Sequence, residues 1–512
     1  MSHAPASLAD LVPATVAEMG ARAARPDFDR WQAQAKGCGH CSRPIRLRGS
    51  TLTHSADGRL VEAYTTATEP DGVVYIRCGN RRAAVCPSCS HEYQGDMWHL
   101  LYAGVAGGIK SVPADVAEHP LDFVTLTGPS FGPVHTTREP GRPCLSSRKP
   151  SWCRHGQAQQ CRRIHSDSDP DLGTPLCPEC YDYEGQVAFN WYAPELWRRF
   201  TISLHRRLAE QLGVPRSRLD EQLVVSFAKV AEFQRRGIVH YHALIRLDGP
   251  GEDYPAPGVD LTVEQLRQAI SAAAASVKVI TDPYEYGGPV WQLRFGEQLD
   301  IRPVHGSANR EASTGPMHPE MVAAYIAKYA TKAADDFGLA PHRLQPDADL
   351  AALPVSAHIR RLLATAIKIG SAAAGTVQLL GDDADALGDD HTDNAAVIAA
   401  AKTWLPITRW LHMLAFRGHF ATKSRRYSTT LGRLRAERRT WRRSHDPNRW
   451  PANTEDDAQG ESTLVIVRQW TLDGAGWLTN GDAALAASAA ARAREHRDLA
   501  REAQDTDQDH QL

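Results

Sequence analysis

The chain has 512 residues, enough for roughly two to four domains that each bury a core. No apolar run approaches the roughly 20 residues that a membrane span needs, and the first 20 residues lack the pattern of a secretory signal. We therefore expect a cytoplasmic protein with no membrane partner. The net charge of −2 by itself favours no class of ligand.

The predicted elements follow one another in a mixed α/β (α+β) order. The first 35 residues are expected to be a flexible leader, and the next region combines cysteines with short alternating stretches typical of a small β-rich module. Strands are predicted at 121–127, 223–233 and 238–247, the last two as a hairpin with a turn at 235–237. Helices are predicted at 192–212, 261–277 and 319–336. An Ala/Asp-rich linker is expected at about 371–401, a basic helical region at 402–445, and a helix at 481–512 that fades into a disordered acidic end.

All ten cysteines lie between residues 38 and 180, and six of them form Cys-x-x-Cys pairs. In a cytoplasmic protein this spacing indicates structural zinc rather than disulfides. We expect one four-thiolate site from Cys38, Cys41, Cys86 and Cys89, for which Cys78 competes. A second site is expected to join Cys177 and Cys180 to two of Cys144, Cys153, Cys161, His155 and His165, with Cys153 and Cys161 favoured. Free thiols in loops are the alternative.

The segment that ends in His240-Tyr241-His242 carries a second metal pattern. In a strand, residues i and i+2 point to the same face, so the two imidazoles can bind one ion. Glu232 precedes them on the other strand of the predicted hairpin, and a carboxylate with two nitrogens is a reasonable ligand set for a divalent ion with open positions. Such an ion polarises a phosphoryl oxygen. Purely structural histidines are the alternative.

Two tyrosines in the predicted helix 319–336 are spaced for a shared face. Tyr325 and Tyr329 are four residues apart, with Lys328 between them. Tyrosine acts as a covalent nucleophile when it is activated, and a lysine can steady a phosphate beside it. Packing is the alternative function for such a pair. Together with the metal pattern, the tyrosines favour an enzyme that nicks a DNA strand.

Charge along the C-terminal part indicates a nucleic-acid partner. Residues 402–449 contain 13 Lys and Arg against two acidic residues, whereas the segment from 451 has 12 Asp and Glu against 5 Arg. Basic residues mixed with aromatics suit backbone contacts and base stacking, and a solvated helix surface is the alternative. The candidate DNA contacts are Arg417, Lys423, Arg425 and Arg426.

These motifs, in this order, resemble those of HUH-type rolling-circle replication initiators, and more narrowly the RepSA-type initiators of actinobacterial plasmids and integrative conjugative elements. The resemblance runs from about residue 36 to 445. It rests on the stretches 123–135, 176–183, 195–202, 322–332 and 416–430, and on the His-x-His and Tyr-x-x-Lys-Tyr motifs.

The resemblance implies a nicking core of antiparallel sheet flanked by helices, a zinc-binding N-terminal region and a basic helical C-terminal region. It implies that one tyrosine attacks single-stranded origin DNA and forms a 5′-phosphotyrosine link, and that the second takes part in termination. Tyr325 would be the first nucleophile and Tyr329 the second, in an order that stays open. His240 and His242, with Glu232 as the third ligand, would hold Mg²⁺ or Mn²⁺.

The implied domains are a leader at 1–35, a zinc-binding module at 36–110, a nicking domain at 111–345 with a zinc-binding insertion at about 140–183, a linker or helical segment at 346–400, a basic DNA-binding region at 401–450 and an acidic, partly disordered tail at 451–512. Residues 107–111 do not have the Gly-Lys-Ser/Thr order of a phosphate-binding loop, so we identify no ATPase motor in the sequence. The expected partners are therefore single-stranded and duplex origin DNA, a host helicase that unwinds the duplex, and a host polymerase. Two alternatives remain: another HUH nuclease, either transposase or relaxase, or a non-catalytic zinc-dependent DNA-binding regulator.

Overall fold

In a computed structural model, the described residues are 12–55, 58–137, 141–145, 151–304, 317–331, 337–339, 342–382, 391–444 and 465–509. The chain divides into two compact units. Unit 1 combines Met1–Asp96 with Arg435–Leu512, and unit 2 is the continuous segment Met97–Leu434. Helices α3 (Pro87–Ala106) and α9 (Leu431–Ser444) each contain a boundary between the units.

Unit 2 is built on a five-stranded antiparallel sheet of order β10-β5-β6-β4-β9. Its strands are β10 (Ala421–Lys423), β5 (Val224–Phe233), β6 (Val239–Asp248), β4 (Leu121–Leu126) and β9 (Leu299–Pro303). Strands β5 and β6 form the predicted hairpin, and its turn places Gly237 at a φ of 75°. Glycine adopts this left-handed conformation without a steric penalty.

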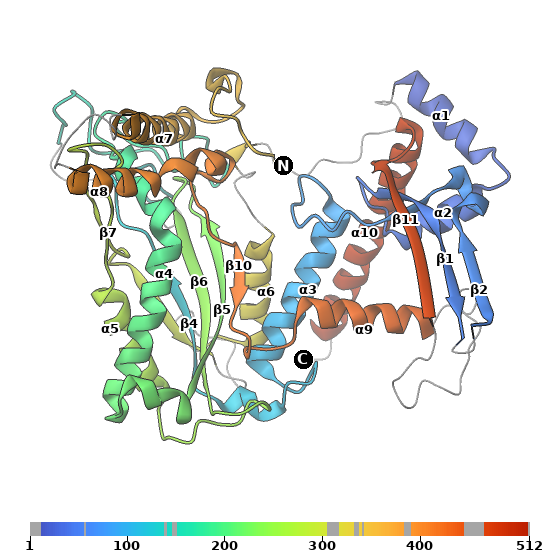
Figure 1. The fold of residues 1–512 in the computed structure, drawn as a ribbon, viewed down its shortest axis with the longest axis horizontal. Helices are drawn as coiled ribbons and strands as arrows, with labels where there is room; N and C mark the ends of the chain where they lie inside the picture. Colours follow the sequence, from blue (N-terminus) through green and yellow to red (C-terminus); the bar gives the residue numbers. More distant parts are fainter. Residues whose placement is uncertain are drawn as a thin grey trace. The chain divides into compact units, whose positions relative to one another are not determined.

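Helices cover both faces of this sheet, which is the mixed α/β architecture expected from the sequence (Figure 1). One face carries the apolar side chains Tyr241, Ala243 and Ile245 of β6, which are buried in a core with helices α4 (Tyr183–Leu212) and α5 (Val263–Ser276). Helix α6 (Pro319–Ala330) lies on the opposite face. Because side chains alternate along a strand, the polar residues of β6 point toward α6.

Helix α4 begins earlier than the predicted residue 192. The carboxylate of Asp182 accepts a hydrogen bond from the backbone N–H of Gly185 at 2.8 Å, which caps the helix at Tyr183. The helix ends at Gly213, in the left-handed conformation. Further elements of unit 2 are η4 (Ala114–Glu118), η5 (Arg216–Glu221), η7 (Leu350–Ala352), α7 (Ala357–Asp382), α8 (His391–Lys402), η9 (Leu405–Met413), β7 (Val279–Ile280) and β8 (Gln292–Leu293).

The expected linker and basic helical region differ from the structure. Helices α7 and α8 occupy most of the segment expected to be a linker at 371–401, and residues 383–390 lie outside the described part. The region 402–445 is divided into η9, β10 and α9, and β10 pairs with β5. The reason is tertiary: buried Trp404, Ile407 and Leu411 pack into the core of unit 2, so the segment up to Leu434 belongs to that unit rather than to an appended helix.

Helix α7 is the one described helix that bears on the expectation about membrane spans. Among the described residues, Ala357–Gly381 is long and apolar enough to cross a membrane by length and composition. Its residues Ile359, Leu363 and Ile369 are buried in the core of unit 2. A core helix passes the same test, so this helix is weak evidence for a membrane.

Unit 1 has a second antiparallel sheet, in which β11 (Val465–Ala475) pairs with β1 (Ile45–His54). Strands β2 (Leu60–Thr65) and β3 (Val74–Ile76) also pair with β1, and short turns η2 (Thr66–Thr68) and η3 (Pro70–Gly72) lie between them. The last helix, α10 (Asn480–Asp509), belongs to this unit. The helix predicted at 481–512 is thus present as α10, and the segment expected to be an acidic, partly disordered tail is structured over residues 465–509, while residues 451–464 and 510–512 lie outside the described part.

The expected leader is also structured. Residues 12–37 form α1 (Pro13–Ala23) and α2 (Phe28–Gly37). Arg22 of α1 is buried and donates hydrogen bonds to Asp482 of α10 at 2.7 and 2.9 Å and to Asp71 at 2.7 Å. These charge-assisted contacts hold α1 in the fold. The partners of Arg22 lie outside the first 35 residues, so the sequence of the expected leader alone does not predict them.

Candidate active site

The β5–β6 hairpin brings the three predicted metal ligands together. Glu232 and His240 are directly opposite each other in the ladder, and His242 is two residues further along the same face. Glu232 Oε2 lies 3.1 Å from His240 Nε2 and 3.2 Å from His242 Nε2. The three ligand atoms lie within 4.8 Å of one another, so they can hold a single ion.

Strand β4 orients His242. Thr125 is its partner across the ladder, and the Oγ1 of Thr125 lies 3.1 Å from Nδ1 of His242. The ring of Phe123 stacks on the imidazole at 5.7 Å with an angle of 11°. Burial lowers the pKa of His242, partly opposed by its hydrogen bond to Glu232. The imidazole is therefore favoured in the neutral state that binds a metal.

Helix α6 places both predicted tyrosines over His242. The ring centroid of His242 is 5.3 Å from that of Tyr325 and 5.5 Å from that of Tyr329, and the two tyrosine rings are 4.7 Å apart. The ammonium of Lys328 lies 6.0 Å from the ring of Tyr329. Tyr325 is 38% exposed. Burial raises the pKa of its hydroxyl, reinforced by the neighbouring Tyr329 and Glu232.

Two charged residues of β9 complete this face and were not predicted. Asp300 is opposite Thr125, and Arg302 is opposite Phe123. Arg302 Nε forms an ion pair with Asp300 at 3.0 Å. Asp300 opposes the lowering of the pKa of His242, and Arg302 opposes the raising of the pKa of Tyr325. The alternation of apolar and polar residues in Leu299–Pro303 could have indicated a strand. The sequence did not show that this strand pairs with β4.

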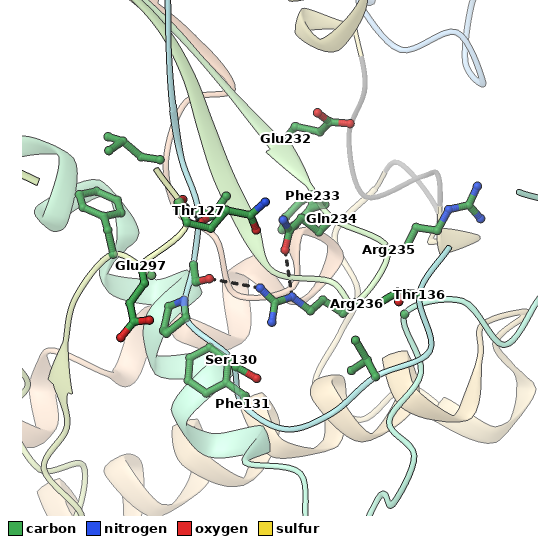
Figure 2. Close-up of a pocket in the computed structure, with 18 of the residues that line it drawn as sticks. Thr127, Ser130, Phe131, Thr136, Glu232, Phe233, Gln234, Arg235, Arg236 and Glu297 are labelled. Carbon is green, nitrogen blue, oxygen red and sulfur yellow. Dashed lines mark hydrogen bonds between the residues drawn. The ribbon is translucent and has the colours of Figure 1, made fainter. Parts of the chain in front are cut away.

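A groove with a volume of about 1850 Å³ lies beside the candidate metal site. Glu232 is one of its lining residues, and the β5–β6 turn contributes Gln234, Arg235 and Arg236 (Figure 2). Arg236 donates hydrogen bonds to Gln234 Oε1 at 2.9 Å and to the carbonyl of Gly128 at 3.2 Å. Arg235 is exposed. The groove thus combines open space, positive charge and one metal ligand.

The cysteines of unit 1 form a set that differs from the expected one. The group whose ligand atoms converge is Cys41, Cys78, Cys86 and Cys89. Cys78 takes the place expected for Cys38, because β3 leads directly into the cluster, and Cys78 Sγ lies 3.7 Å from Cys89 Sγ. Cys38 is at the end of α2, and its thiol donates to the carbonyl of Ala35 at 3.2 Å.

The insertion of unit 2 contains two converging groups instead of one. Cys177 and Cys180 gather with Cys153 and His155, so the favoured partner Cys161 is replaced by a histidine. Cys161 belongs to another group, with Cys144, His135 and His165. His135 was not considered as a ligand, because it lies outside the cysteine-rich stretch from which the partners were chosen.

The candidate DNA contacts have different surroundings. Arg425 and Arg426 are exposed. Lys423 Nζ donates to the backbone carbonyls of Ser424, Arg425 and Ser428 at 3.2, 3.3 and 3.0 Å, which holds the turn that presents the two arginines. Arg417 is exposed, and its guanidinium lies 4.6 Å from the ring of Trp191.

Comparison with known proteins identifies similar chains. The family described as "Replication initiator protein, pSAM2" (RepSA) matches residues 27–491. A replication initiator protein of Streptomyces ambofaciens is 39% identical over 496 residues, covering 96% of this chain and 96% of that protein. No solved structure matches this chain.

Proposed function

We propose, because this chain belongs to the RepSA family of replication initiators, that it starts rolling-circle replication by nicking and rejoining single-stranded DNA at its origin. The observation that carries this proposal is the packing of two tyrosine rings, one edge-on and one tilted, against a histidine of the group of three candidate metal ligands. A covalent nucleophile and a Lewis-acid site on one face of a sheet are the parts that phosphodiester transfer requires.

The residues at the hairpin fit a divalent cation. Thr125 Oγ1 is placed to accept a hydrogen bond from His242 Nδ1, which leaves the lone pair of Nε2 for a metal. One carboxylate and two imidazoles leave coordination positions for substrate oxygens, which suits Mg²⁺ or Mn²⁺. A bound cation would polarise the scissile phosphate and lower the pKa of a nearby hydroxyl.

The transfer itself balances without another reactant. The hydroxyl oxygen of Tyr325 or Tyr329 forms a bond to phosphorus, the P–O3′ bond breaks, and the phenolic proton ends on the departing 3′ oxygen. The product is a 5′-phosphotyrosine and a free 3′-hydroxyl that primes synthesis. In the reverse step a 3′-hydroxyl attacks phosphorus and releases the tyrosine. The two tyrosines can therefore serve initiation and termination in turn.

Neighbouring cationic side chains stabilise the negative charge that develops on the tyrosine oxygen. Burial disfavours the charged form of Tyr325, and Arg302 partly offsets this. Lys328 is one residue from Tyr329 and provides positive charge for the phosphate during transfer. We assign to Lys328 the role of steadying the phosphate.

The remaining roles follow from the same proposal. The four thiolates of unit 1 would hold one structural Zn²⁺. The protein would act in the cytoplasm on single-stranded and duplex origin DNA, with a host helicase and polymerase. The family match favours an initiator over a transposase or relaxase. A non-catalytic regulator is the alternative that the following experiment addresses.

The test is a nicking assay with the full chain on a supercoiled plasmid and on oligonucleotides that carry the element's own origin, with Mg²⁺ or Mn²⁺. We expect a metal-dependent covalent protein–DNA adduct that is lost in His240→Ala and in the double variant Tyr325→Phe/Tyr329→Phe. Each single tyrosine variant identifies which residue attacks first.

The matched control is Tyr286→Phe, which removes the same hydroxyl from a tyrosine that is 78% exposed and lies elsewhere in unit 2. This variant should form the adduct at the wild-type rate. Tight origin binding with no adduct under either metal would reject the nicking function and favour the regulator.

A further inference from the structure

The insertion of unit 2 contains two groups of potential metal ligands, which alternate in pairs along the chain. His135 and Cys144 belong to the first group, and Cys153 and His155 to the second. Cys161 and His165 return to the first group, and Cys177 and Cys180 complete the second. Because the pairs alternate, the ligands of one group can come together only if the chain segments that carry the other group also come close to one another. This order distinguishes a built module from cysteines gathered by chance.

In the first group the ligand atoms face a common point. His165 Nε2 lies 3.1 Å from His135 Nδ1 and 3.4 Å from Cys161 Sγ, and Cys144 Sγ lies 3.9 Å from His135 Nδ1. The backbone N–H of Thr136 donates to Cys144 Sγ at 3.1 Å. Two thiolates and two imidazoles form the tetrahedral donor set that zinc prefers.

An outer hydrogen bond orients this group as well. Asp169 Oδ2 lies 2.7 Å from Nδ1 of His165, the nitrogen that faces away from the other ligands. Arg163 in turn forms an ion pair with Asp169 at 3.0 Å. A carboxylate that accepts from the second ring nitrogen is the usual support of a metal-bound histidine. The four candidate ligands are therefore supported by a hydrogen bond from outside the group, between Asp169 and His165.

The second group is a three-cysteine, one-histidine set. His155 Nδ1 lies 3.2 Å from Cys180 Sγ and 3.6 Å from Cys177 Sγ. Cys153 is the fourth member. Cys153 and Cys180 are only partly buried, so a reagent can reach both thiols if no metal covers them.

The first group also connects the insertion to the active-site hairpin. His135 and Thr136, together with Asp169 and Gly173, line the groove that contains Glu232 (Figure 2). Gly173 has a φ of 82° and lies so close to the β5–β6 turn that a Cβ there would meet the carbonyl carbon of Arg235 at 2.4 Å. The backbone N–H of Gly173 donates to the carbonyl of His135 at 2.8 Å, so the loop that carries Gly173 is tied to a ligand of the first group and packs against the β5–β6 turn.

We propose that the insertion binds two zinc ions, one at His135, Cys144, Cys161 and His165 and one at Cys153, His155, Cys177 and Cys180, and that the first ion holds the wall of the groove against the β5–β6 turn. Counting the site of unit 1, the intact protein would bind three zinc ions through nine of its ten cysteines. Both new sites have four protein ligands, which is typical of structural rather than catalytic zinc.

The primary test is the zinc content of the full chain, measured by mass spectrometry of the metal after purification. We expect three zinc ions in the wild type and two in Cys144→Ser/Cys161→Ser and in Cys153→Ser/Cys177→Ser. The matched control Cys38→Ser removes the cysteine that joins none of the described groups and should keep three. A wild type with a single zinc, or a Cys144→Ser/Cys161→Ser variant that keeps all three, would overturn the proposal.

A second measurement does not depend on variants that fold. Alkylation of the native wild type, mapped by peptide mass spectrometry, should leave Cys153 and Cys180 unmodified until a chelator removes the zinc. Immediate modification of both thiols before chelation would contradict the second site.

A separate experiment tests whether the groove wall positions the β5–β6 turn, and it rests on the proposed nicking function. Gly173→Ala should keep three zinc ions but lower the nicking rate about tenfold or more, because the added methyl group displaces the turn. Gly213→Ala is the control, since Gly213 also has a positive φ but has open space around its Cβ position. If both variants nick at the same rate, the proposal that the Gly173 loop positions the β5–β6 turn is rejected. If the wild type does not nick, the proposed nicking function is rejected, and the zinc content alone tests the two zinc sites.

Discussion

His242 links three strands and one helix of the site, so its surroundings decide what the site can bind. It contacts Glu232 of β5, Thr125 of β4 and the tyrosines of α6. The hydroxyl of Thr125 can accept a hydrogen bond from Nδ1 of His242. A neutral imidazole with its proton on Nδ1 presents Nε2 beside the carboxylate of Glu232.

Replacing Thr125 by valine should weaken the catalytic metal site without removing a ligand. Valine keeps the shape but cannot accept a hydrogen bond from His242 Nδ1, so we expect the affinity for Mn²⁺ to fall about 10- to 100-fold. The dependence of the nicking rate on Mn²⁺ concentration measures this. Thr125→Ser keeps a hydroxyl and should stay near the wild type, and an unchanged metal dependence in Thr125→Val would refute the role of the threonine.

At the scale of elements, strand β10 connects the basic segment to the sheet that carries the candidate active site. It pairs with β5, the strand that carries Glu232. The turn after β10 is held by Lys423, which donates to three backbone carbonyls, and it exposes Arg425 and Arg426. Of the four predicted DNA contacts, Lys423 therefore shapes the turn, Arg425 and Arg426 are available to a phosphate backbone, and Arg417 lies over the ring of Trp191.

The variant Arg425→Ala/Arg426→Ala should weaken binding to single-stranded and duplex DNA with little dependence on sequence. The slope of log affinity against log salt should fall by about 1 for each arginine that no longer binds a phosphate. Fluorescence anisotropy over a salt series provides the measurement. The control Arg198→Ala/Arg207→Ala removes two arginines of α4 that form ion pairs within their own helix. If both variants change the slope equally, Arg425 and Arg426 make no specific contribution.

At the scale of the whole molecule, the two ends of the chain fold together in unit 1. Strand β11 pairs with β1 along ten residues of β1, and the buried pair Arg22–Asp482 joins α1 to α10. Burial alone would lower the pKa of Arg22, but hydrogen bonds and ion pairs with Asp482 and Asp71 raise it above its ordinary value. The guanidinium is therefore charged and depends on both carboxylates.

Replacing Asp482 by alanine should destabilise unit 1 by about 3 kcal/mol or more, because it leaves a buried charge with one partner fewer. Calorimetry of the full chain should show the transition of unit 1 at a lower temperature and that of unit 2 unchanged. Asp498→Ala, at an exposed position of the same helix, should leave both transitions in place. Equal effects of the two substitutions would show that the buried pair contributes no special stability.

The arrangement of the candidate catalytic residues was predictable because its patterns are local. A strand period of two places His240 and His242 on one face, a short hairpin brings Glu232 to them, and a helical spacing of four places Tyr325 beside Tyr329. Asp300 and Arg302 were missed because their relation to the site passes through the pairing of β9 with β4, far from β9 in the sequence.

By itself, the sequence determined the mixed α/β class, the hairpin and helix that carry the candidate catalytic residues, and the presence of cysteine pairs with metal-ligand spacing. Only the tertiary structure decided that Cys78 rather than Cys38 joins the cysteine group of unit 1, that Cys161 and Cys153 belong to different groups, and that β11 near one end of the chain pairs with β1 near the other. The physical reason is range: side-chain periodicity along a strand or helix is set by neighbouring residues, whereas ligand sets and sheet partners depend on packing between segments that lie far apart in the chain.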